Sequence, residues 1–323
     1  MSWRPKLSWE NAQLRAKLIS DIRSFFNDKE VLEVETPLMS QGTVTDVHLD
    51  AFSTRYDFLA DHPDSKAYFL QTSPEFAMKR LLASGYGCIY QICKAFRHEP
   101  QGRFHNPEFT MLEWYRVGYD HFQLMDEVSL LLKCVLGCKE PVRLTYQRAF
   151  IEYTAIDPLQ TDIDQLKAYL LKIDRLDSWL KDEACLDTLL QFIFAEFVEP
   201  HIGLGEPCFI YDFPLSQASL AKVSNIDNRV AERFECYYKG IELANGFHEL
   251  TNASEQKQRF NQDNALRAEK GLPERAIDQR FISALTNGLP DCAGVAIGID
   301  RLVMLALDTK NITDVISFTT DNA

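Results

Sequence analysis

Arginine and acidic side chains gather in a polar loop between two strand-like segments. Residues 88–96 form an apolar, extended run, and residues 109–115 alternate with the period of two that is typical of a strand with two distinct faces. Arg97 and Glu99 stand at one end of the loop, and Arg103 lies on it. A guanidinium group offers a planar fork of donors that matches phosphate oxygens. The pattern predicts an antiparallel hairpin that grips a polyphosphate and its base; the alternative is an ordinary hairpin with a solvated, charged tip.

A second segment, far along the chain, carries the residue types of an anion site. Residues 294–302 are expected to form a strand rich in small residues, which runs into a helix-compatible apolar block at 302–307. Glycine in a strand costs stability and usually marks the close approach of a ligand or another backbone. Arg301 stands at the strand-to-helix junction, where helix amide groups already favour an anion. Together with the first loop, this segment favours a nucleotide-binding site.

Several segments resemble the class II aminoacyl-tRNA synthetases in their lysine-specific form. Those similar to motifs 1, 2 and 3 of that family are FFNDKEVLEVETP at 25–37, FRHE at 96–99 with HNPEFTMLEWY at 105–115, and GVAIGIDRL at 294–302. Those that match the lysyl enzymes are GIELANGFHEL at 240–250 and NITDVI at 311–316. The resemblance extends over essentially the whole chain. It implies an α+β fold, a mixed antiparallel sheet flanked by helices, and a homodimer formed through the region that ends at Pro37.

The residues before the first helix distinguish members of this family. Ser8 fits a helix N-cap. The apolar residues of the helix recur four apart on one face, at Leu14, Leu18, Ile22 and Phe26. An oligonucleotide-binding barrel of five strands needs more than about 40 residues, and far fewer precede this helix. We expect no anticodon-binding domain, so the resemblance is to the stand-alone lysyl-synthetase paralogues that modify elongation factor P.

Composition indicates which classes of protein are excluded. The 323 residues are 46% hydrophobic and 25% charged, which is ordinary for a globular protein. With 34 basic and 47 acidic residues, the chain has a net charge of −13 and lacks the positive field expected of a nucleic-acid binder. tRNA is therefore not the expected partner. No apolar stretch reaches the roughly 18–20 residues of a membrane span, and the start is not a signal peptide. A cytoplasmic enzyme is expected. The eight cysteines are scattered and predict buried, reduced thiols.

Periodicity predicts the remaining elements. Ser73 is expected to cap a helix whose first residue is Pro74. The other expected elements are strands at 31–36 and 68–71, a helical insertion at about 120–205, and helices near 253–270 and 275–287. We expect one catalytic domain that spans residues 1–323.

The resemblance also implies roles for individual residues. It implies ATP and Mg²⁺ as cofactors, with Arg97 and Arg301 clamping the phosphates and Glu242 binding magnesium, and these three are the expected catalytic residues. The other expected ATP contacts are His98, Glu99, Asn106, Leu243 and Gly298. The residues expected to contact the amino acid are Ser73, Pro74, Glu75, Tyr115, Glu249 and Ala296, of which Glu249 is also a candidate magnesium ligand.

Some of these roles have structural alternatives. Glu242 and Glu249 are seven residues apart, a spacing that would put them on opposite faces of one continuous strand. If they act together, Gly246 must mark a bend or bulge; otherwise both are surface glutamates at strand ends. Glu75 could serve only its helix dipole, and Tyr115 could be plain core.

The implied reaction is a two-step ligation. The carboxylate of lysine or (R)-β-lysine attacks the α-phosphate of ATP, and a lysine side chain of elongation factor P then displaces AMP. Positioning and charge neutralisation suffice for such chemistry. Ala296 replaces a glycine of the lysyl-tRNA synthetases and is expected to favour (R)-β-lysine, unless it points into the core. The alternatives are a ligase that charges tRNA or a small molecule, and an inactive regulatory paralogue.

Overall fold

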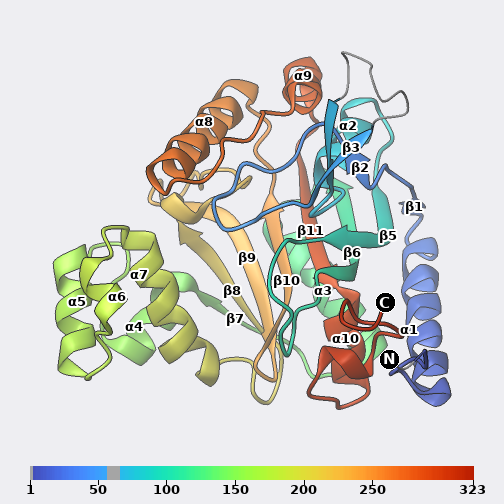
Figure 1. Cartoon of the computed structure of the whole chain (residues 1–323), viewed down its shortest axis with the longest axis horizontal. Coiled ribbons are helices and arrows are strands. Elements are labelled where there is room, and N and C mark those ends of the chain that lie inside the picture. The colour runs from blue at the N-terminus through green and yellow to red at the C-terminus, as the bar shows by residue number, and fades with distance from the viewer. Residues whose placement is uncertain (1–2, 57–65) are drawn as a thin grey trace. The chain divides into compact units, whose positions relative to one another are not determined.

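The computed structural model describes residues 3–56 and 66–323 and contains two compact units, which are described separately (Figure 1). Unit 1 consists of Met1–Gly137 and Glu249–Ala323, and unit 2 of Cys138–His248. Within the described ranges, no helix combines the length and the apolar character needed to cross a bilayer.

Four strands in the described part of unit 1 pair side by side in the order β1-β5-β6-β11. Their bounds are β1 Leu32–Glu33, β5 Ile89–Phe96, β6 Glu108–Val117 and β11 Cys292–Gly298. β1 runs parallel to β5, and the other two pairings are antiparallel, so the hairpin predicted around residue 97 is confirmed. A small antiparallel sheet accompanies them, with β2 Met39–Ser40, β4 Lys66–Leu70 and β3 Ser53–Tyr56 in that order.

The helices of unit 1 follow the predicted pattern closely. They are α1 Trp9–Asn27, α2 Glu75–Ala83, α3 His121–Leu136, α8 Ala253–Glu269, α9 Gln279–Gly288 and α10 Ile299–Ala306, with the 3₁₀ turn η4 Ile312–Asp314. Ser8 caps α1 by accepting a hydrogen bond from the Asn11 amide. Phe26 stacks on Tyr90 of β5, with ring centres 4.4 Å apart, so α1 packs on one face of the strands. Leu18, Ile22 and Phe26 are buried, whereas Leu14 is 52% exposed.

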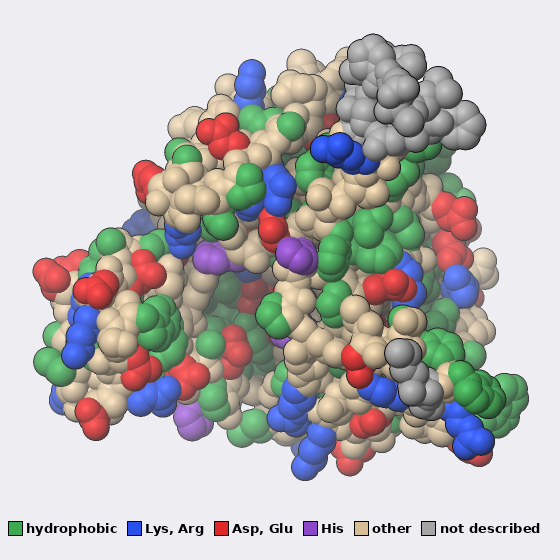
Figure 2. Space-filling view, viewed as in Figure 1, with side chains coloured by type: hydrophobic (Ala, Val, Ile, Leu, Met, Phe, Trp, Pro, Cys, Tyr) green, Lys and Arg blue, Asp and Glu red, His purple; other side chains and the backbone are tan. Residues whose placement is uncertain are grey.

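Unit 2 has its own sheet and helical core. Its strands follow the order β10-β9-β8-β7, with bounds β7 Val142–Thr145, β8 Cys208–Pro214, β9 Val230–Tyr238 and β10 Ile241–His248. Its helices are α4 Tyr146–Thr154, α5 Ile163–Lys172, α6 Ser178–Asp182, α7 Leu186–Ile193, the π-helical η1 Phe194–Val198 and the 3₁₀ turns η2 Glu199–His201 and η3 Leu215–Gln217. They enclose a buried apolar cluster in which Tyr146 stacks on Phe194. Acidic, basic and hydrophobic side chains are interspersed on the displayed face of these helices (Figure 2).

The division into two units bears on the predicted fold class and on the predicted helical insertion. The mixed strands and flanking helices confirm the α+β class. The helices expected as one insertion at about 120–205 divide between the units, since α3 belongs to unit 1 and α4 to α7 belong to unit 2. The prediction of a single catalytic domain stays a prediction. All eight cysteines are free thiols, but only Cys208, Cys236 and Cys292 are buried, and Cys134 is exposed.

Candidate active site

The two faces of β6 have different surroundings. Trp114 faces α1 and α3, where its indole Nε1 donates to Glu127 Oε2 at 3.0 Å and its ring packs edge-on against Phe26. Glu113 and Tyr115 are on the opposite face, because successive strand residues alternate. Both are buried. This confirms that Tyr115 shares a face with Glu113 and places both beside α2.

A buried acidic cluster lies on this face of unit 1. Glu113 accepts hydrogen bonds through Oε2 from Ser73 Oγ at 2.6 Å and through Oε1 from the Tyr115 hydroxyl at 2.5 Å. Lys79 Nζ lies 2.6 Å from Glu75 Oε1 and 2.5 Å from Glu249 Oε2. We call these six residues the acidic cluster: Ser73, Glu75, Lys79, Glu113, Tyr115 and Glu249. The structure therefore brings together four of the residues predicted to contact the amino acid, and adds two that the sequence did not assign.

The start of α2 positions the first residues of the acidic cluster. Ser73 Oγ accepts a hydrogen bond from the Glu75 amide at 3.0 Å, as a capping side chain does. The helix begins at Glu75 with Pro74 at the N-cap position, one residue later than predicted, and Pro74 is buried. Lys79 follows Glu75 by one helical turn, so both point to the same side of α2.

Burial sets the protonation of the acidic cluster. It raises the pKa of Glu113 to about 7, helped by the nearby charge of Glu75 and opposed by the hydrogen bonds from Ser73 and Tyr115. Burial also raises the pKa of Glu249 to about 8, although the charge of Lys79 opposes this shift. For Lys79, burial favours the neutral form, but the charges of Glu249 and Glu75 outweigh it and raise the pKa. Lys79 is therefore an ammonium group, and the carboxyl groups share its single charge.

β11 forms the wall beside the acidic cluster. Its register with β6 places Gly294 opposite Tyr115 and Ala296 opposite Glu113, so these side-chain positions share one face. A Cβ atom on Gly294 would lie 2.3 Å from the Tyr115 ring and 2.6 Å from Glu249 Oε1. The predicted close approach to this glycine is thus made by two side chains of the cluster. Ala296 is half-buried and lies beside Glu113.

The predicted phosphate clamps lie on the loop that joins β5 to β6 and on α10. Arg301 is in the first turn of α10, whose N-cap is Gly298. Its Nε donates to the Phe104 carbonyl at 3.4 Å, and its guanidinium lies 2.7 Å from His105 Nε2. Arg97 lies with its guanidinium carbon 5.2 Å from the centre of the Phe109 ring. Both arginines are half-buried, and their phosphate contacts stay predictions.

The C-terminal segment holds the same loop in place. Arg103 Nε donates to the Lys310 carbonyl at 2.8 Å, and the Arg103 carbonyl accepts from the Ile312 amide at 2.9 Å. Asn106 is buried, and its Oδ1 accepts a hydrogen bond from the Thr320 amide at 3.2 Å. These contacts give Arg103 and Asn106 a role in fixing the loop. The predicted ATP contact of Asn106 is not tested by them.

The remaining predicted nucleotide contacts lie at the start of the loop. His98 is exposed, its amide donates to the Asp50 carbonyl at 2.8 Å, and its ring packs edge-on against Phe52. Glu99 is half-buried, and its amide donates to the Arg97 carbonyl at 2.9 Å.

A buried ion pair that the sequence did not reveal anchors α10. Asp300 Oδ1 lies 2.7 Å from Arg15 of α1, and Oδ2 accepts from the Thr110 amide of β6 at 2.7 Å. Arg15 also donates to Thr110 Oγ1 at 2.9 Å and to the Val315 carbonyl at 3.2 Å. Helix, strand and C-terminal segment are therefore joined next to Arg301.

Unit 2 carries Glu242 and Leu243 at an irregular point of β10. The register with β9 shifts between Glu242 and Ala244, which leaves Leu243 as the extra residue of a bulge. Gly246 pairs regularly with Phe234, so the bulge predicted at Gly246 lies at 243 instead. Glu242 is half-buried and Leu243 is buried.

A second buried carboxylate lies near Glu242 on the same sheet face. Glu235 forms an ion pair with Arg233 at 2.5 Å and accepts a hydrogen bond from the Tyr237 hydroxyl. Burial raises the pKa of Glu235, and the charge of Glu242 contributes to the rise. The half-buried carboxylate of Glu242 fits Mg²⁺, which prefers carboxylate oxygens. Glu235 and Glu249 fit the metal less well, because Arg233 and Tyr237 already occupy the oxygens of Glu235 and an ammonium group occupies one oxygen of Glu249.

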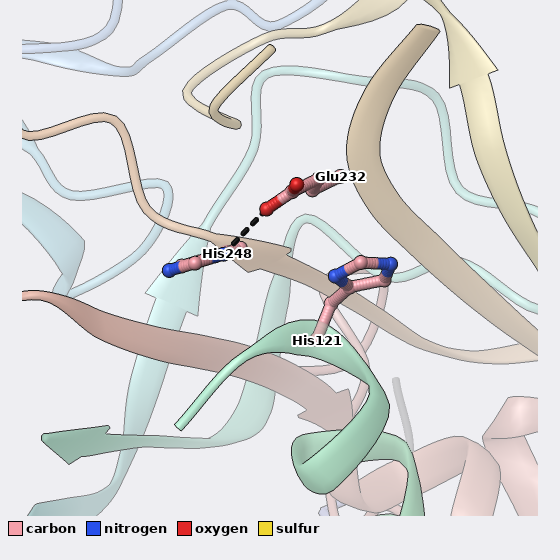
Figure 3. A group of neighbouring side chains, drawn as sticks. All are labelled: His121, Glu232 and His248. Atoms are coloured by element: carbon pink, nitrogen blue, oxygen red, sulfur yellow. Dashed lines mark hydrogen bonds and ion pairs between the residues drawn. The ribbon is translucent and has the colours of Figure 1, made fainter. Parts of the chain in front are cut away.

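Figure 3 shows a further ion pair of unit 2, between Glu232 and His248. Both side chains are largely shielded from solvent, and the ring Nδ1 faces the carboxylate. His248 closes β10 directly before Glu249, and its carbonyl accepts from the Lys222 amide at 2.8 Å. The pair therefore fixes the end of β10 within unit 2. His121, also labelled in Figure 3, belongs to unit 1.

Comparison with known proteins connects this geometry to a family. The model of the family described as tRNA synthetases class II (D, K and N) matches residues 1–322. The chain belongs to this family. The class II resemblance seen in the motifs is thus confirmed over the full length.

Relatives within the class II synthetase family are similar from end to end. Proteins of Salmonella typhi, Salmonella paratyphi B and Salmonella dublin are each named elongation factor P–(R)-β-lysine ligase. Each is 56% identical to this chain over 322 residues, which cover 100% of this chain and 98% of the relative.

Proposed function

We propose that this class II synthetase activates (R)-β-lysine, or lysine, with ATP and transfers it to a lysine side chain of elongation factor P in the cytoplasm. The observation that carries the proposal is the acidic cluster. The three carboxyl groups of this cluster suit an amino acid with two ammonium groups and would disfavour one with an apolar side chain, because their excess negative charge would then lack a countercharge. The full-length similarity to proteins named elongation factor P–(R)-β-lysine ligase supports the same substrate and acceptor.

The first step is an in-line attack by the substrate carboxylate on the α-phosphate of ATP, which gives an acyl-adenylate and pyrophosphate. Glu75 and Glu249 bind the amines of the substrate, and Tyr115 orients Glu113. Arg97 and Arg301 bind the phosphates and stabilise the charge that develops there. Magnesium, held by Glu242, would neutralise further phosphate charge. In the second step the acceptor amine attacks the acyl carbon and AMP leaves.

The mass of the acceptor protein tests this proposal. Incubation with ATP, (R)-β-lysine and elongation factor P should increase the acceptor mass by one β-lysyl group. Acceptor whose target lysine is changed to arginine should stay unmodified. Unmodified acceptor together with charged tRNA would favour the tRNA-directed alternative. Absence of pyrophosphate exchange with every amino acid would favour the inactive paralogue.

We also propose that the protein is a homodimer through the region that ends at Pro37. Trp9 and Leu14 of α1 are 73% and 52% exposed, and Leu32 of the edge strand β1 is 52% exposed. Apolar surface of this kind usually has a partner. Sedimentation should show a dimer at micromolar concentration, and Leu14→Asp should weaken it. Leu171→Asp, on exposed α5 of unit 2, is the matched control and should not.

A further inference from the structure

Lys79 is a buried ammonium group between two carboxyl groups of the acidic cluster. Its Nζ lies 2.6 Å from Glu75 Oε1 and 2.5 Å from Glu249 Oε2, and the side chain is 1% exposed. Phe281 of α9 approaches from another side, with its ring centre 5.8 Å from Nζ. Lys79 thus joins the first turn of α2 to the residue that follows β10.

Lys79 contacts one oxygen of each carboxyl group. The second oxygen of Glu249, Oε1, lies over Gly294, since a Cβ atom built there would be 2.6 Å away. Gly294 and Ala296 share a face of β11, because they are two residues apart on one strand. The ion pair with Lys79 therefore turns Glu249 Oε1 toward the wall that carries Ala296.

The charges of the acidic cluster do not balance within the protein. Glu75, Glu113 and Glu249 share the single ammonium group of Lys79, while Ser73 and Tyr115 offer Glu113 only neutral hydroxyl donors. When all three carboxyl groups are ionised, two of their negative charges have no countercharge among the described residues of the cluster. Buried carboxylates without countercharges are costly. A ligand with two ammonium groups supplies the two charges that are missing.

We propose that Lys79 is a positioning residue that sets the pocket to accept an amino acid with two ammonium groups. It neutralises one of the three carboxyl groups and fixes the orientation of Glu75 and Glu249. Without it, the two carboxylates would repel each other, and three negative charges would face two ammonium groups of the substrate. This inference rests on the proposed activation of a diamino acid and names the residue that makes the pocket selective for it.

Lys79→Met tests the proposal, because methionine keeps the unbranched stem and removes the charge. Lys17→Met is the matched control. Lys17 likewise pairs with an acidic residue one helical turn away, Asp21, but on the exposed side of α1. Pyrophosphate exchange should show a KM for (R)-β-lysine raised at least about tenfold in Lys79→Met, since loss of one partner of a buried ion pair disturbs the other. The KM for ATP should stay within about twofold, and Lys17→Met should match the wild type.

A double variant separates charge balance from folding. Lys79→Met combined with Glu75→Gln removes one charge of each sign, so it folds even if the single Lys79 change does not. The rise in KM of the double variant should be smaller than the product of the two single effects, because the residues act on each other. Effects that multiply would overturn the proposal. So would a Lys79→Met protein with lower thermal stability and unchanged KM for (R)-β-lysine.

Direct binding distinguishes failure of this inference from failure of the proposed function. A wild-type protein that activates no diamino acid would overturn the proposed function. Calorimetry with 1,5-diaminopentane, which has two ammonium groups and no carboxylate, still tests Lys79 in that case. Weaker binding to Lys79→Met than to the wild type would support the role of Lys79, and equal binding would overturn it.

Discussion

The amino-acid end and the phosphate end of the site in unit 1 are built in opposite ways. At the amino-acid end, Glu113 and Glu249 are buried and held by side chains of α2 and β6. At the phosphate end, Arg97 and Arg301 are half-buried: Arg97 packs on Phe109 of β6, and Arg301 contacts the loop between β5 and β6. Buried charges couple ligand selection to folding, because their partners are also part of the core. Groups near the surface can act on a ligand while the fold depends little on them.

The largest expected effect is the loss of activity when Arg301, at the phosphate end, is changed. Arg301→Ala should reduce pyrophosphate exchange by about 10²–10³-fold, because one preorganised charge donor at the phosphates is lost. Its free energy of unfolding in urea should change by no more than about 0.5 kcal/mol. Near-normal exchange would show that Arg301 does not bind the phosphates. A large loss of stability would show that the two ends of the site do not differ in how far the fold depends on them.

Glu113 should couple stability to pH. Its folded-state pKa of about 7 lies above the ordinary value of 4.5, first because of burial and then because of the charge of Glu75. The stabilisation is therefore complete below pH 4.5 and is lost as pH rises through 7, a difference of about 3 kcal/mol. Urea unfolding between pH 5 and 8 should show this decline in the wild type. Glu113→Gln should make the decline smaller and leave the part that Glu249 contributes, whereas Glu108→Gln, an exposed change on the same strand, should leave the whole decline intact.

Two glycines of β11 allow a matched comparison of packing. Gly294→Ala should lower the free energy of unfolding by about 1–3 kcal/mol, because its Cβ would overlap the buried Tyr115 ring. Gly298→Ala should be tolerated, since the nearest atom would be Arg301 Cδ at 3.6 Å. Equal stability losses in urea would show that backbone entropy, and not contact with the acidic cluster, decides the cost.

The smallest expected effect concerns substrate choice at Ala296. Its register opposite Glu113 places the methyl group beside the acidic cluster. Ala296→Gly should shift the ratio of kcat/KM values toward lysine and away from (R)-β-lysine by about 1.4 kcal/mol, roughly tenfold. An unchanged ratio in pyrophosphate exchange would mean that Ala296 only fills space.

Sequence patterns predicted the elements whose signals are local. The N-cap at Ser8 depends on neighbouring residues and is confirmed. The strand-to-helix junction was expected at Arg301 but lies earlier, since α10 begins at Ile299. The bulge of β10 lies beside Glu242 and not at the more permissive Gly246, the position that the sequence offered for it.

These sequence patterns did not predict the long-range pairings of the site. The spacing of Glu75 and Lys79 at i and i+4 is a usable signal for their ion pair. Nothing near Lys79 in the sequence indicates its second partner, Glu249. The same holds for Arg15 and Asp300, which come together only when α1 packs against β6 and α10.

The contacts between the loop after β5 and the C-terminal segment fix the order in which the site can form during synthesis. Arg103 and Asn106 emerge from the ribosome long before Ile312 and Thr320, the residues that hold them. Domains fold from the N-terminus as the chain emerges. The hairpin can pair early, but its loop has no anchor until residues 312–320 have emerged. A nascent chain can therefore carry a paired hairpin before it has a finished nucleotide site.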